Sequence, residues 1–164
     1  VSWSRGLGDV YKRQELSFPP SLFAESFKKV LESGVNITIH AGEGDGVSSI
    51  IDALNNGAMR IGHGVRIIED INNGIIGPTA SKIIDLQIPL EICITSNIHT
   101  NMYESYEAHP ITSLIDYGFN VYLNTDNRLM SNTSISKEIE IAKNLGINDV
   151  DRLLKYSASD SFFD

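Results

Sequence analysis

The stretch NITIHAGEGDG, from Asn36 to Gly46, alternates like a β-strand and then ends in residues that can do chemistry. Its two isoleucines fall on one face of the expected strand, and Thr38 and His40 fall on the other. A tight turn after a strand needs only a glycine. His40 and Glu43 therefore need another explanation, and the stretch predicts a strand with a functional carboxyl end.

The same pattern recurs along the chain. Short apolar segments predict further strands, and segments with apolar residues at helical spacing lie between them. Because strands alternate with helices, the sequence predicts an α/β fold with four parallel strands, each followed by a helix. The expected strands cover about 37–40, 60–64, 89–94 and 121–126, and the expected helices about 19–34, 47–57, 75–86, 109–118, 135–146 and 149–159.

An open doubly wound sheet and a (β/α)8 barrel both fit this alternation. The strand ends favour the barrel, because all four carry polar groups and barrels build their sites from the carboxyl ends of successive strands. The chain also has no glycine-rich phosphate loop of the GxGxxG or GxxxxGKS kind. A barrel needs about 250 residues. The 164 residues therefore predict half of a barrel.

Composition narrows the class of protein. The net charge of −8 argues against nucleic acid or an anionic membrane as a main partner. No apolar run reaches the roughly 20 residues of a membrane span. Cys93 is the single cysteine, so no internal disulfide forms, and a cytoplasmic location is expected. No obligate protein partner is evident. Residues 1–14 lack a helix or strand period and are interpreted as a non-native leader.

Four side chains at the strand ends suit one kind of chemistry. Two histidines and an aspartate (His40, His63 and Asp126) are natural zinc ligands or proton-transfer groups. Glu43 is a carboxylate that can move protons beside a bound metal. The glycine before Glu43 is interpreted as room for a substrate to approach. On spacing alone, structural roles for these residues remain open.

Four motifs, in order, resemble the adenosine deaminase family: HAGE (40–43), RIGHGV (60–65), LEICITSN (90–97) and NTDN (124–127). FPPSLF (18–23) also resembles the segment before the HAGE strand. The resemblance covers residues 15–164. It implies the last four βα units, the C-terminal half, of a zinc-dependent (β/α)8 TIM barrel. Such an enzyme hydrolyses adenosine and deoxyadenosine, which are nucleosides, to inosine and ammonia.

The resemblance also implies roles. His40 is a zinc ligand and Asp126 completes the zinc shell. Glu43 protonates the purine ring nitrogen next to the attacked carbon, and His63 orients or activates the water. Asn127 stands where many members carry a second aspartate that contacts N7, and its amide can donate without an added proton.

One departure concerns the metal. The family's first strand carries a His-x-His pair that supplies two zinc ligands, and no such pair occurs here. This chain is therefore expected to be inactive alone and to aggregate or dimerise. The alternatives are a deaminase of adenine or another aminopurine, a non-catalytic fragment, and an unrelated metal-dependent amidohydrolase.

Other polar residues receive structural interpretations. His109 is expected at a helix start, and Cys93 in the packing of a strand. Ser96 and Asn97 are expected to support the rim of the site. The acidic run Glu138–Glu140 is expected on a solvated helix face.

Overall fold

The computed structural model describes residues 15–16 and 18–155. The segment interpreted as a leader (1–14) and the end of the last expected helix (156–159) lie outside the described residues. No helix in the described part of the chain is long and apolar enough to cross a membrane.

Four parallel strands form the central sheet, and they lie side by side in chain order, β1-β2-β5-β6. Their bounds are β1 (Thr38–Ala41), β2 (Arg60–His63), β5 (Leu90–Ile92) and β6 (Val121–Leu123). In the register of the first pair, Ala41 lies opposite His63. The carboxyl ends of β1 and β2 therefore lie next to each other, as a barrel site requires.

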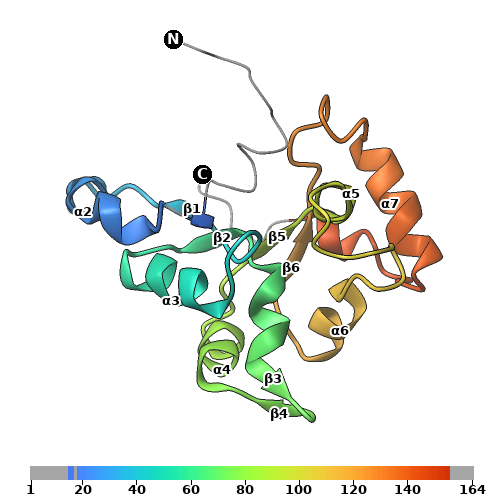
Figure 1. Ribbon diagram of the computed structural model, residues 1–164, viewed down its shortest axis with the longest axis horizontal. Coiled ribbons are helices and arrows are strands. Elements are labelled where there is room, and N and C mark those ends of the chain that lie inside the picture. The colour runs from blue at the N-terminus through green and yellow to red at the C-terminus, as the bar shows by residue number, and fades with distance from the viewer. Residues whose placement is uncertain (1–14, 17, 156–164) are drawn as a thin grey trace.

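Helices connect the strands, so the predicted alternation of strand and helix is confirmed. The helical elements are η1 (Pro20–Phe23), α2 (Ala24–Glu32), α3 (Val47–Asn55), η2 (Val65–Asp70), α4 (Pro78–Asp85), α5 (Ile94–His99), α6 (Ile111–Asp116), α7 (Ile135–Asn144) and η3 (Arg152–Leu154). Figure 1 shows α2, α3, α4, α6 and α7 fanned around the sheet in chain order.

The core lies between the sheet and these helices. Ile39, Ile61 and Leu90 point toward the helices and are buried. The other face of the sheet is polar: Thr38 is exposed and Glu91 half-buried. In a closed barrel this second face is the interior. The sheet therefore has the two faces of one wall of a barrel, which agrees with the predicted fold class.

Two predicted boundaries were wrong. The helix expected from about residue 75 begins only at Pro78, because Ile75–Ile76 (β4) pairs antiparallel with Ile71–Asn72 (β3). The strand expected to run to residue 94 ends at Ile92, and α5 takes the next residues. The two-residue strands of the hairpin and the six-residue helix α5 are too short to show a repeating pattern in the sequence.

Glu138 also departs from its prediction. It is fully buried in α7, whereas Glu140 is exposed. Its Oε1 accepts a hydrogen bond from the Thr133 hydroxyl at 2.6 Å, and its Oε2 accepts one from the backbone N–H of Thr95 at 3.2 Å. Glu138 therefore joins α7 to the segment that follows β5.

Candidate active site

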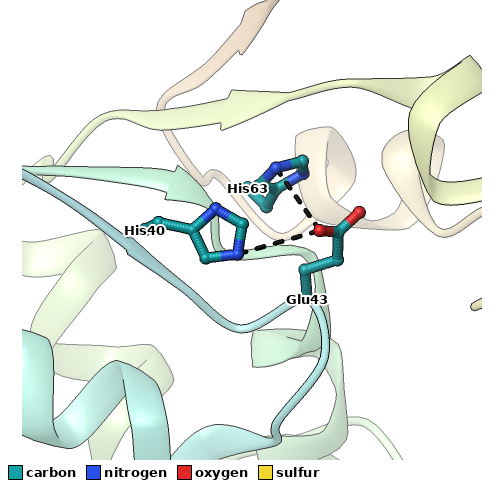
Figure 2. A group of neighbouring side chains, drawn as sticks. All are labelled: His40, Glu43 and His63. Carbon is teal, nitrogen blue, oxygen red and sulfur yellow. Dashed lines mark ion pairs between the residues drawn. The ribbon is translucent and has the colours of Figure 1, made fainter. Parts of the chain in front are cut away.

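Three side chains from neighbouring strand ends converge on one point. His40 lies near the end of β1, Glu43 in the turn that follows, and His63 at the last position of β2. Both imidazole rings face the Glu43 carboxyl (Figure 2). His40 Nε2 lies 3.7 Å and His63 Nε2 lies 3.6 Å from Glu43 Oε2. The structure therefore brings together three of the five predicted site residues.

Burial sets the electrostatics of this group. Glu43 is 2% exposed, and burial raises the pKa of its carboxyl to about 7. Burial, and then the neighbouring His63, lowers the pKa of His40. Burial also lowers the pKa of His63. Near neutral pH the two imidazoles are thus uncharged, and Glu43 holds its proton for a large part of the time.

Asp126 lies at the edge of the group. Its Oδ2 lies 4.0 Å from His63 Nε2 and accepts a hydrogen bond of 2.8 Å from the Ser96 hydroxyl. The backbone of His63 (φ 65°) and of Asp126 (φ 54°) is left-handed, which is uncommon outside glycine. Such backbone concentrates at functional sites. Ser96 acts as the predicted support.

Asn127 follows Asp126 and is held in its own loop. Its Oδ1 accepts a hydrogen bond of 3.1 Å from the backbone N–H of Met130. Its amide nitrogen is therefore the end of the side chain that is left to donate.

A metal ion fits the group. Ligand atoms of His40, Glu43 and His63 lie within 4.8 Å of one another. His40 Nε2 is buried and has no hydrogen-bond partner among the described residues, so its lone pair can bind a metal ion. The sequence predicts His40 and Asp126 as the metal ligands. By the distances between ligand atoms, the structure instead groups His40 with Glu43 and His63.

The polar face of the sheet holds a cavity of about 320 Å³ next to this group. Burial raises the pKa of the Cys93 thiol well above its usual value, so Cys93 stays protonated and is a poor nucleophile. Residues that line the cavity are Thr38, His40, Gly62, His63, Glu91, Cys93, Asn124 and Asp126.

The glycine of HAGE has a structural reason in the turn itself. Gly42 has a left-handed backbone (φ +71°), and a Cβ there would meet Ile50 Cδ1 at 2.5 Å and Gly64 Cα at 3.1 Å. Ile50 belongs to α3 and Gly64 follows β2, so a larger residue at Gly42 would clash with both neighbouring segments. The glycine is therefore needed to pack the turn against α3.

Glu15 was missed by the sequence analysis. It is 4% exposed. Its Oε2 accepts hydrogen bonds from the backbone N–H groups of Glu43, Gly44 and Asp45, and its Oε1 accepts one from the Ser49 hydroxyl. A lone acidic residue before an apolar segment carries no signal for such a role.

Asn97 and His109 also lie closer to the site than predicted. Asn97 is fully buried, and its Nδ2 lies 2.9 Å from Glu43 Oε1 and 3.2 Å from His63 Nδ1. Its Oδ1 lies 3.1 Å from His109 Nε2. His109 precedes α6 as expected, but it is only 3% exposed.

Comparison with protein families gives a match over nearly the whole chain. The model of the adenosine deaminase family matches residues 10–164. Adenosine deaminase 1 of Streptomyces coelicolor is 46% identical over 132 residues, which is 77% of this chain and 33% of that protein. An adenosine deaminase of Mycobacterium ulcerans is 43% identical over 131 residues, 76% of this chain and 36% of that protein. The chain thus spans about a third of the length of these curated relatives.

Solved structures share the fold. An adenine deaminase from Arthrobacter aurescens superposes with a TM-score of 0.76 and 26% identity, over 85% of this chain and 41% of that one. An Arabidopsis protein complexed with IMP gives 0.71 and 26%, over 87% of this chain and 40% of that one. An amidohydrolase with bound Zn gives 0.73 at 22% identity, over 85% and 39%, which shows the fold alone.

Proposed function

Because the chain belongs to the adenosine deaminase family, we propose that it supplies part of the active site of an enzyme that hydrolyses adenosine and deoxyadenosine. In this reaction water adds to the purine carbon that bears the amino group, the carbon–nitrogen bond breaks, and inosine and ammonia form. The observation that carries the proposal is the buried Glu43 carboxyl, with its pKa raised to about 7, between two histidines. Residues 15–164 would form the last four βα units of the barrel.

Glu43 is assigned as the proton donor to the purine ring nitrogen. A carboxyl with a pKa near 7 holds a proton at neutral pH and can give it up as negative charge develops on the ring. A helix N-cap would explain a carboxylate near α3, but Gly46 is the N-cap residue and no side chain caps it.

His40 and Asp126 are assigned as the residues that would hold zinc, and His63 as the residue that orients or activates the attacking water. When bound, zinc would lower the pKa of a water molecule and so supply a nucleophile near neutral pH. The assignment of His40 as a ligand is supported by its buried Nε2, which has no hydrogen-bond partner among the described residues. A stoichiometric metal other than zinc in the purified, active protein would overturn the choice of metal.

Asn127 is assigned to N7 of the purine, because its Oδ1 is held by Met130 and its amide nitrogen is left to donate. We expect Asn127→Asp to make substrate affinity pH-dependent, since an aspartate needs a proton to donate. An unchanged KM and an unchanged pH profile would contradict this assignment.

The test joins residues 15–164 behind the N-terminal part of the Streptomyces coelicolor relative and measures inosine formation. We expect the folded chimera to deaminate adenosine, and Glu43→Gln to lower kcat about 10²- to 10⁴-fold. Glu140→Gln, at an exposed glutamate, is the control and should leave kcat unchanged. A folded, metal-loaded chimera that does not act on adenosine would overturn the proposal.

Adenine is the second candidate substrate, because the adenine deaminase from Arthrobacter aurescens shares the fold at a TM-score of 0.76. The same chimera assayed with adenosine, adenine and AMP separates the candidates. We also propose a cytoplasmic location from the single cysteine. Recovery of the protein in an extracellular fraction would contradict it.

A further inference from the structure

We propose that His109 and Asn97 are positioning residues that fix the ring proton of His63 on Nε2, the nitrogen that faces the site. The meaning of this assignment for catalysis rests on the proposed function, whereas its geometry does not. Neither residue lines the cavity. One chain of hydrogen bonds runs from the start of α6 to the site.

The first link fixes the proton of His109. The backbone N–H of Ile111 donates to His109 Nδ1 at 3.2 Å, so this nitrogen is an acceptor. A neutral imidazole with an acceptor Nδ1 carries its proton on Nε2. Burial, and then the nearby His63, lowers the pKa of His109 to about 3, so the ring is neutral at physiological pH.

The second link fixes the amide of Asn97. His109 Nε2–H faces Asn97 Oδ1 at 3.1 Å and donates to it. The amide nitrogen must then lie on the other side, where its two protons meet two acceptors. One proton goes to Glu43 Oε1 at 2.9 Å, and the other to His63 Nδ1 at 3.2 Å.

The third link fixes His63. Because its Nδ1 accepts from Asn97, the neutral ring carries its proton on Nε2. This nitrogen lies 3.6 Å from Glu43 Oε2 and 4.0 Å from Asp126 Oδ2. His63 thus presents a ring N–H, rather than a lone pair, to the site. Of its two proposed roles, this geometry selects the one that orients the water over the one that accepts its proton.

The test is ¹⁵N NMR of the chain labelled at its histidine rings, at mildly alkaline pH and with chelator present. Ring nitrogen shifts distinguish a protonated from an unprotonated nitrogen, and the His63 signals are those lost in His63→Asn. We expect an unprotonated Nδ1 and a protonated Nε2 on His63. The opposite pattern in the wild-type chain overturns the proposal.

Three variants test the links. Asn97→Asp replaces the donor by an acceptor and should move the His63 proton to Nδ1, whereas a residue with only a structural role would leave it on Nε2. His109→Phe should give a mixture of tautomers, and His109→Gln, whose amide can still donate to Asn97, should keep the wild-type pattern. An Nε2 proton that persists in Asn97→Asp overturns the proposal. Since no substrate is used, failure of the adenosine assay would overturn the proposed function alone.

Discussion

Glu15 holds the turn that carries Glu43, because one carboxylate oxygen accepts three consecutive backbone N–H groups. We expect Glu15→Gln to lower the free energy of unfolding by about 2 kcal/mol, since hydrogen bonds to a charged acceptor are worth about 1.5–3 kcal/mol. Denaturant unfolding measures this change, and amide exchange at residues 43–45 should quicken.

Glu32→Gln, at an exposed glutamate of α2, is the control for Glu15→Gln. It should change the unfolding free energy by less than about 0.5 kcal/mol. Equal denaturant midpoints for the two variants would show that the Glu15 carboxylate does not hold the turn.

His109 makes the fold sensitive to acid. Its pKa is about 3 in the folded chain, against 6.5 for an unperturbed histidine, chiefly because of burial. Between these values the unfolded chain binds a proton that the folded chain does not. The free energy of unfolding therefore falls as the pH falls through this window, by at most about 1.4 kcal/mol per pH unit.

His109→Gln removes the titrating ring and keeps a donor for Asn97. We expect its unfolding free energy to depend less steeply on pH between 6.5 and 3 than that of the wild-type chain. The measurement is a series of denaturant unfolding curves across this range. Parallel curves for the two proteins would contradict the buried, neutral state of His109.

The site residues that the sequence predicted were those at the ends of strands. His40, Glu43 and His63 stood out because chemistry-bearing side chains followed an alternating segment, and the structure brings them together. Glu15 contacts the site region from 28 to 34 residues away in sequence, and His109 reaches the site through Asn97, which lies 54 residues from Glu43. No local period records such contacts, so they could not be predicted.

At the scale of elements, Glu138 ties α7 to the segment after β5 through two hydrogen bonds from a fully buried position. We expect Glu138→Gln to lower the unfolding free energy by about 1–2 kcal/mol, because an amide offers one acceptor oxygen in place of two. Glu140→Gln, two residues along the same helix and exposed, should stay within about 0.5 kcal/mol of the wild-type chain.

Thermal or denaturant unfolding decides between these outcomes. If Glu138→Gln and Glu140→Gln unfold at the same temperature or denaturant concentration, the buried hydrogen bonds of Glu138 make no measurable contribution to the free energy of unfolding. Its burial was hidden from the sequence because it sits in an acidic, helical run (Glu138–Glu140) that is typical of a solvated face. Periodicity did place the four strands and α3, α6 and α7, since each of them presents an apolar face to the core.

At the scale of the whole molecule, the described sheet ends at β1 and β6, each paired on one side only. Its polar face is the one that would point into a closed barrel. Unpaired strand edges are sites of self-association. We expect the purified chain to show a molecular mass that grows with concentration in light scattering, whereas a constant monomer mass would contradict this.

The deaminase activity of the purified chain also depends on the whole molecule. His40 and Asp126 are two proposed zinc ligands, and a catalytic zinc usually has three protein ligands. We expect the purified chain with added zinc to form no measurable inosine from adenosine. Inosine formation that is lost in Glu43→Gln would contradict this expectation and would show that the chain is active by itself.

The order of the strands has a consequence for how the protein is made. The strands β1, β2, β5 and β6 lie in the sheet in the order in which they are synthesised. When a new strand leaves the ribosome, the strand with which it pairs has therefore already been made. Short separations in sequence between partners lower the entropy lost on pairing and speed folding. His40, Glu43 and His63 all belong to the first two strands and the turn between β1 and α3. Their cluster can therefore assemble while the later strands are still being translated.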